Sequence, residues 1–455
     1  MRTKRQSLCF IFILMFSLFS LVPLFAKDVL VKSIPNDAEF RIAIKDTWLT
    51  EVPDRTLRQK PGLFKLPDGT LIQVRAESVG QELMVILARE RLGDYPGWIQ
   101  GSWIVNRSMQ DGKIVRIRIF LRSDPYTYIQ FRPLTEDRSE LDVVLYDGFA
   151  VRSLPVPLPL ERIMYMSLND VLATLGDKFP RKYFDPLIDL YADTRSFVSS
   201  VRKRLPELIF RDDGAIDEDG RYVLIETLEP QTGEAQGVNC SGFAKWIVDG
   251  LLRPLTGTQL TIPPLKAPFG DRGSSFTAPY EDLRDPFFGL DWSRNLAAAT
   301  WSVLRSPSFA NLDEIEVRDQ NLSTVIMRNG RTSSLRSYPG FLRNAGYGIE
   351  GLHPLLYMLA INEPGHIYLA AVNDEQGTNP PLRQFFHIAV LVPYFNEYGD
   401  FQVACFESAE ETSFNAFKTR YPGGYVNLSR LPVEANFDPQ KAIRGRLDIE
   451  NLLRR

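Results

Sequence analysis

Cysteine and histidine are both scarce in this chain of 455 residues, which contains three of each. So few cysteines exclude a small scaffold held together by disulfides. The 53 lysines and arginines are balanced by 56 acidic residues, and no basic run is long enough to indicate a nucleic-acid partner. The acidic cluster between residues 209 and 226 lacks the alternate spacing of a calcium loop. A hydrophobic share of 44% is typical of a globular protein, and the length predicts two or more domains.

Only the N-terminus carries an apolar run of near-spanning length. Arg2, Lys4 and Arg5 precede an apolar run over residues 8–26 that ends in Pro-Leu-Phe-Ala. This pattern is typical of a signal peptide, 1–26, cleaved after Ala26, with an uncleaved membrane anchor as the alternative. We therefore expect an exported protein, periplasmic or extracellular and associated with the cell envelope, with no stable membrane span after cleavage.

Residues 27–155 predict a β-rich N-terminal domain. Short segments rich in Val, Ile, Tyr and Phe alternate with Gly, Asp and Pro clusters, and Asp111-Gly112 is a plausible hairpin turn. We expect a sandwich or a barrel here, with Trp98 and Trp103 in its core.

The remainder, 156–455, begins with the linker Val-Pro-Leu-Pro and predicts an α+β domain. Helices are expected first, and the strands Gly365–Val372, Phe386–Val392 and Phe401–Phe406 come near the end, before a loop-rich tail. Between them, residues 255–350 resemble a large insertion, and long irregular insertions near a site often act as lids or substrate walls.

One motif in this domain places a thiol at the start of a predicted helix. In Gly-Val-Asn-Cys-Ser-Gly-Phe, Asn239 is a suitable N-cap and Cys240 follows it, while Phe243 and Trp246 begin an apolar stripe at helical spacing. The positive end of the helix dipole favours a thiolate at Cys240. The small residues after it leave room for a substrate backbone.

The same residues resemble the nucleophile motif of the NlpC/P60 cysteine peptidases, usually Asp-Cys-Ser-Gly-Phe, with Asn239 in place of the Asp. A second resemblance lies downstream, where His387-Ile-Ala-Val-Leu-Val is similar to the family's His-Val-Gly-Ile-Tyr-Val strand, whose histidine is the base. The resemblance implies a papain-like core in which a nucleophile helix packs on an antiparallel sheet. It also gives Tyr222 as the candidate for the family's upstream tyrosine.

A thiol nucleophile needs a base, and the base needs a third group that holds its tautomer. His387 is the expected base, whereas His366 and His353 are interpreted as structural. If Val392 faces Gln402 in a hairpin, Glu407 lies opposite His387 and is the candidate third group, with a surface acid as the alternative. A register shift of two residues puts Cys405 opposite His387 instead.

The mechanism implied is thiol acyl transfer, with the backbone N–H of Cys240 or Ser241 stabilising the oxyanion. The resemblance implies peptidoglycan as the substrate and partner: hydrolysis of the γ-D-glutamyl bond to the diamino acid of stem peptides. No cofactor and no metal is expected.

Three other interpretations remain open. In the first, the protein is a thiol amidase or acyltransferase that acts on another substrate. In the second, it is a catalytically silent envelope protein that uses the fold for binding. A disulfide between Cys240 and Cys405 would favour the silent form. A metal site built from these cysteines with His366 and His387 lacks the compact spacing of zinc ligands.

Overall fold

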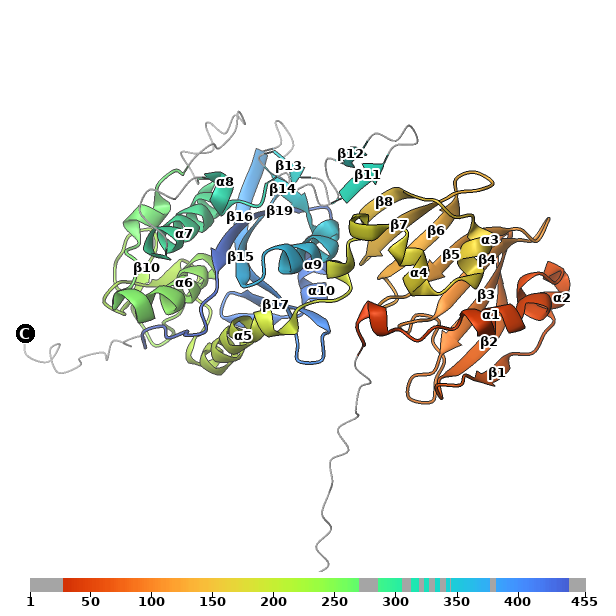
Figure 1. Cartoon of the computed structure of the whole chain (residues 1–455). Coiled ribbons are helices and arrows are strands. Elements are labelled where there is room, and N and C mark those ends of the chain that lie inside the picture. The colour runs from red at the N-terminus through yellow and green to blue at the C-terminus, as the bar shows by residue number, and fades with distance from the viewer. Residues whose placement is uncertain are drawn as a thin grey trace, which may run out of the picture.

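The computed structural model describes residues 28–269, 285–304, 312–318, 323–326, 332–335, 341–343, 345–376 and 382–441. The expected signal peptide, 1–26, lies outside the described residues. Among the residues that are described, no helix is long and apolar enough to cross a membrane. The described residues form two large sheets and one two-stranded sheet, with helices around them, so the expected α+β class is confirmed (Figure 1).

The N-terminal half is built on one antiparallel meander whose strands pair in sequence order. These strands are β1 (Gly62–Lys65), β2 (Leu71–Val79), β3 (Glu82–Arg89), β4 (Trp103–Ser108), β5 (Ile114–Ile119), β6 (Tyr128–Pro133), β7 (Ser139–Leu145) and β8 (Gly148–Val156). Buried and part-exposed residues alternate along β2, as expected for a strand with one face on the core. The strands belong to a single sheet with β1 at one edge, rather than to the sandwich or barrel expected from the sequence.

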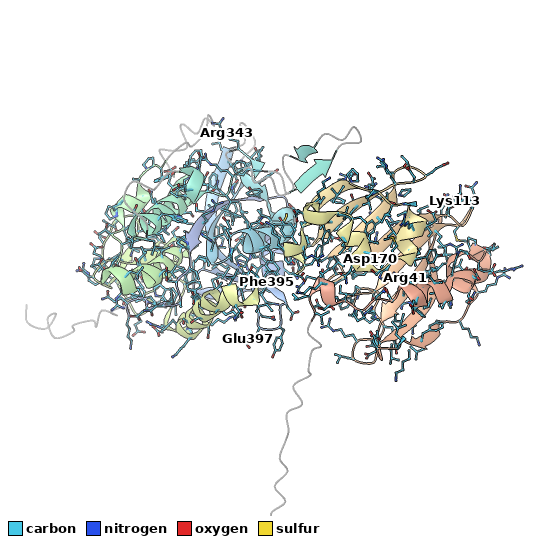
Figure 2. The ribbon with its side chains drawn as sticks, viewed as in Figure 1. Arg41, Lys113, Asp170, Arg343, Phe395 and Glu397 are labelled. Atoms are coloured by element: carbon cyan, nitrogen blue, oxygen red, sulfur yellow. The ribbon has the colours of Figure 1, made fainter. Side chains whose placement is uncertain are left out.

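Short helices complete this half of the molecule. They are α1 (Ala38–Ala43), α2 (Pro53–Leu57), α3 (Leu160–Tyr165) and α4 (Leu168–Ala173). Arg41, labelled in Figure 2, joins them to the sheet, because it lies over the Trp103 ring at 3.8 Å and donates from Nε to the carbonyl of Met164 at 2.7 Å. Since α3 contacts β5 and β6, the N-terminal unit continues past the linker expected near residue 156.

The C-terminal half is organised around a second, antiparallel sheet, with the strand order β13-β14-β19-β15-β16-β17-β18. Its strands are β13 (Phe341–Leu342), β14 (Gly346–Gly348), β15 (His366–Gln376), β16 (Leu382–Phe395), β17 (Phe401–Glu407), β18 (Glu410–Thr412) and β19 (Tyr425–Pro432). The tail expected to be loop-rich supplies β19, which pairs with β15 in the middle of the sheet.

Helices cover this second sheet. They are α5 (Ala192–Arg204), α6 (Cys240–Thr256), α7 (Phe288–Leu304), α8 (Leu312–Ile315), α9 (Leu352–Asn362) and α10 (Phe414–Arg420). In Figure 1 the sheet lies between α6 and α7 on one side and α9 on the side of the N-terminal half. A hairpin of β9 (Gly214–Ile216) and β10 (Tyr222–Leu224) packs on α6. Short helical segments occur at Val31–Ser33, Lys45–Leu49, Gly176–Lys178, Arg181–Tyr183, Ile188–Tyr191, Leu205–Glu207, Pro263–Lys266 and Ile349–Gly351.

The region expected to be an insertion is part of both sheets. Helix α7 packs against α6, β15, β16 and β19. Glu316, which follows α8, accepts from Arg294 of α7 at 2.6 Å, and both side chains are buried. Further along, β11 (Ser323–Ile326) pairs in parallel with β8 and carries β12 (Thr332–Leu335) to the edge of the N-terminal sheet. The described part of this region is thus integrated into the fold and is no detachable lid.

A buried junction joins the two halves. The Tyr146 ring, at the turn between β7 and β8, stacks on His353 of α9 with centroids 3.9 Å apart. Arg122 of the N-terminal half donates to the carbonyls of Phe184 and Gly399 in the other half. Burial lowers the pKa of His353 to about 4, so this ring is neutral and acts as an aromatic surface. The structural interpretation of His353 agrees with this position.

Candidate active site

Cys240 is the first residue of α6, and its surroundings are those of a helix N-terminus. The side-chain Oδ1 of Asn239 accepts the Gly242 N–H at 2.8 Å, as expected of an N-cap. The N–H groups of Cys240 and Ser241 belong to the first turn, where no helical carbonyl is available to them. Cys240 is half-buried, so a thiol at the positive end of the helix dipole stays within reach of a ligand.

The first turn of α6 is held by close packing. A Cβ on Gly242 would come within 2.1 Å of the Gly214 carbonyl oxygen, so only glycine allows β9 to lie this near. On the other side, Trp292 of α7 donates from Nε1 to the Ser241 carbonyl at 2.9 Å. The helix that carries the thiol is therefore fixed by the hairpin before it and by a helix of the inserted region.

His387 enters the site from β16, next to an irregularity in the sheet. His387 faces Val372 of β15 while Phe385 faces the following residue, Asn373, so Phe386 is the extra residue of a β-bulge. Bulges of this kind re-aim neighbouring side chains and are frequent beside active sites. The His387 ring lies next to the Cys240 thiol, close enough for each group to shift the pKa of the other. Its Nε2 lies 2.7 Å from Oε2 of Glu407, which leaves Nδ1 for the thiol.

Glu407 is brought to His387 by a register different from the one expected. In the β16–β17 pair Val392 faces Ala404, not Gln402, so the predicted register is wrong by two residues. Continued to Glu407, the observed register places it diagonally to His387 on the same face, a separation that long side chains span. The side chain is nearly buried, at 3% exposure, and the Nη1 of Arg420 donates to its other oxygen, Oε1, at 2.6 Å.

The charges of this cluster stabilise a thiolate–imidazolium pair. Burial alone would raise the pKa of the Cys240 thiol, but hydrogen bonds with His387 and the Ile388 N–H, together with the His387 charge, bring that pKa below its ordinary value. Burial would likewise lower the pKa of His387, but its hydrogen bonds to Cys240 and Glu407 raise it to about 9. Burial would raise the pKa of Glu407, but His387, Thr412 and Arg420 hold it below its usual range.

Two residues of the cluster were missed in the sequence. Arg420 ends α10, and the ring of the next residue, Tyr421, lies 5.8 Å from the His387 ring. Both come from the tail that the sequence pattern assigned to loops. A cue is present in Ser413, which caps a short helix by accepting from the Ala416 N–H, and that helix ends with two basic residues in its last turn.

The other two residues expected at the site lie on its inner side. The Ser241 hydroxyl is 3.9 Å from the Cys240 sulfur, and the residue is buried at 3% exposure. Tyr222 is equally buried on β10, where it faces Ile216 in the hairpin that packs on α6. Ser241 therefore adjoins the thiol directly, whereas Tyr222 belongs to the layer behind the helix.

The remaining cysteine and histidine have other surroundings. Cys405 is a free, buried cysteine on β17, and Cys240 is also free, so no disulfide blocks the candidate nucleophile. Burial raises the pKa of Cys405 far above its ordinary value. His366 directs Nδ1 to the Glu363 carbonyl at 3.0 Å and stacks on Trp301, as its structural interpretation predicts. Within the described ranges, no group of three or more potential ligands is placed to hold a metal ion.

Comparison with known proteins bears on the N-terminal half alone. A family model described as a domain of unknown function (DUF8515) matches residues 31–183. Neither a curated protein nor a solved structure matches the chain. The matched segment ends before α5, so Cys240, His387 and Glu407 all lie outside it.

Proposed function

We propose that the C-terminal half is a cysteine hydrolase of the NlpC/P60 kind, with a papain-like core, that cleaves an amide bond by thiol acyl transfer. One observation carries the proposal. The Cys240 thiol at a capped helix N-terminus lies beside His387, close enough for each group to shift the pKa of the other, and the Nε2 of His387 lies 2.7 Å from an oxygen of a buried carboxylate. This is the nucleophile, base and orienting group that a thiol hydrolase requires.

In the proposed reaction the Cys240 thiolate attacks the carbonyl carbon of the scissile amide. A carbon–sulfur bond forms, and the negative charge moves to the carbonyl oxygen, where the N–H groups of the first turn of α6 stabilise it. The His387 imidazolium then gives its proton to the leaving nitrogen as the carbon–nitrogen bond breaks. Water, deprotonated by His387, hydrolyses the thioester and restores the thiol. Glu407 stabilises the imidazolium through Nε2.

The proposed substrate is peptidoglycan, cleaved between the γ-D-glutamyl group and the diamino acid of its stem peptides. The support is the sequence resemblance around Cys240 and His387, together with a signal-peptide pattern that would carry the chain out of the cytoplasm. The protein is accordingly placed in the periplasm or outside the cell, at the cell envelope.

The test is digestion of purified muropeptides by the chain from Lys27 onward, with new amino groups located by mass spectrometry. Cleavage by this protein and by Cys405→Ala, together with none by Cys240→Ala, is the expected result. If muropeptides stay intact while small thioesters or amides are cleaved, peptidoglycan is the wrong substrate and the thiol amidase or acyltransferase takes its place. If Cys240 also fails to react with an alkylating reagent, the hydrolase proposal is wrong.

A further inference from the structure

A cavity of about 1000 Å³ lies at the junction of the two halves, away from the candidate active site. One wall is the loop between β3 and β4, and the other is the loop between β16 and β17. Its lining is aromatic, apolar and acidic: Arg91, Leu92, Asp94, Tyr95, Pro96, Trp98, Ser123, Asn396, Tyr398 and Asp400. Ligand sites occur preferentially at such domain junctions.

Leu92 occupies a position that folding does not explain. Arg91 and Asp94 exchange backbone hydrogen bonds around a two-residue turn, in which Leu92 has a φ of 55° and Gly93 a φ of 87°. Positive φ at both positions is the geometry of a type I′ turn, which favours Asn-Gly and disfavours leucine. Leu92 is nevertheless 64% exposed. Leu92 therefore adds an exposed apolar side chain to the wall of the cavity.

Tyr398, in the opposite wall, is an exposed ring on a rigid loop. Asn396 accepts at Oδ1 from the N–H groups of Tyr398 and Asp400, both at 2.9 Å. The Gly399 carbonyl accepts from the buried Arg122 of the N-terminal half, so the junction itself fixes the loop. The Tyr398 side chain remains 50% exposed. Figure 2 labels Phe395 and Glu397 at the start of this loop.

Trp98 differs from every other tryptophan of the chain. It is half-buried and lines the cavity, whereas the remaining five are at most 5% exposed. Those five are Trp48, Trp103, Trp246, Trp292 and Trp301. The sequence placed Trp98 and Trp103 together in the core, and that is wrong for Trp98. Its ring is a preformed surface whose indole edge carries a hydrogen-bond donor.

We propose that this cavity is a saccharide-binding site that holds the glycan strand of the polymer whose peptides the C-terminal half cleaves. Tyr95, Trp98 and Tyr398 supply aromatic rings for stacking on the C–H face of a pyranose, and Asp94 and Asp400 supply carboxylates that accept hydrogen bonds from its hydroxyl groups. The two carboxylates repel acidic peptides and phosphates, because Arg91 is the one cation in the lining. An uncharged amino-sugar strand fits both the rings and the carboxylates.

The position of the cavity gives the site a distinct role, which rests on the proposed function. His387 lies near the start of β16 and Asn396 directly after its end, so the two places are roughly 30 Å apart at the rise of a β-strand. A sugar in the cavity is therefore not the one that bears the cleaved peptide. The site anchors the polymer and affects polymeric substrate, while soluble muropeptides are cleaved independently of it.

Binding is tested in Cys240→Ala, so that the result does not depend on catalysis. Because Trp98 is the one tryptophan that is not buried, a β-1,4-linked N-acetylglucosamine hexamer should protect its fluorescence from acrylamide in a saturable way. Leu92→Asn and Tyr398→Ala should each weaken binding at least tenfold. Leu92→Asn installs the residue that the turn prefers, so its melting temperature should stay level or rise. Leu63→Asn and Tyr126→Ala, at residues 61% and 54% exposed elsewhere, are the controls.

Three outcomes would overturn the proposal. They are no saturable protection by the hexamer, undiminished binding by both cavity variants, and competition by sugar-free stem peptides, which would make the site a peptide site. With Cys240 restored, the cavity variants should lose activity on insoluble peptidoglycan and keep it on soluble muropeptides. If no variant or parent cleaves muropeptides while hexamer binding persists, the proposed function fails and the saccharide site stands.

Discussion

Cys240 and Cys405 lie in two regions of the C-terminal half whose surroundings shift the thiol pKa in opposite directions. Cys240 begins a helix, is half-buried and has a lowered pKa, because His387 and the Ile388 N–H contact its sulfur. Cys405 lies within β17 and is fully buried. Its pKa is raised because burial disfavours the charged thiolate. The comparison shows that a cysteine becomes reactive at the end of a helix, where polar neighbours stabilise the thiolate. Burial in the core makes a cysteine less reactive.

Exchanging each thiol for alanine gives the largest expected contrast. Cys240→Ala should lower the rate of muropeptide cleavage by at least about 10⁴-fold, because no covalent intermediate forms. Cys405→Ala should keep the rate within a few-fold and instead destabilise the fold by about 1–2 kcal/mol, since it removes a buried sulfur. The rates are measured by chromatography of the products and the stabilities by urea unfolding. Equal activity losses would place Cys405 in the reaction.

Removing the His387 ring should raise the pKa of Cys240 and make this thiol as unreactive as that of Cys405. In His387→Ala the thiol loses a hydrogen bond and a positive neighbour, so its pKa should rise to or above its ordinary value. We expect cleavage to fall about 10³-fold and iodoacetamide labelling at pH 7 to fall at least about tenfold. Labelling followed by peptide mapping separates Cys240 from Cys405. If labelling at pH 7 stays as fast as in the parent, the helix terminus alone activates the thiol.

The sequence was sufficient to single out Cys240 and His387 as neighbours in a candidate site, because each lies in a local sequence signal. Asn239 and the apolar stripe define the start of α6, and His387 is followed by a continuous apolar run that is typical of a buried strand. Glu407 was proposed from an incorrect register. Ser408 and Ala409 take positive φ in the turn after it, at 50° and 68°, which residue types rarely reveal. The contacts of Arg420 and of Trp292 are long-range, and one sequence contains no record of them.

The fold was predictable to the same extent. Alternation in the N-terminal half gave its strands, because period-2 patterning is local. It did not give the single open sheet, because the order of strands in a sheet and its cover, such as α3 on β5 and β6, depend on contacts between residues far apart in the sequence. In the same way residues 255–350 were expected to be an insertion, and the burial of α7 from this region against α6 depends on long-range contacts such as the one between Trp292 and Ser241.

Glu407→Gln tests how the imidazolium is maintained. The pKa of His387 is raised to about 9, so the ion pair persists below that pH and is lost as the pH rises through it. Any stability that this charge contributes is complete below the ordinary histidine pKa of about 6.5 and disappears through pH 9. Glutamine removes the carboxylate charge, so the alkaline limb of the rate profile should move to lower pH, with kcat reduced about 10–100-fold. An unmoved limb would show that Glu407 does not set the His387 pKa.

Arg420→Met should have the smallest effect and the opposite sign. Arg420 is 47% exposed, so water screens its charge, but it holds the Glu407 oxygen that faces away from His387. Without it the carboxylate charge acts on His387 alone, so the alkaline limb should stay or move slightly upward while kcat falls about 2–5-fold, and Arg420→Lys should recover part of the loss. Arg202→Met is the matched control, because Arg202 is also 47% exposed and pairs with Glu411 rather than Glu407. If the alkaline limb of the rate profile moves to lower pH, as expected for Glu407→Gln, Arg420 acts by holding Glu407 in place, and the charge of Arg420 has little effect on the His387 pKa.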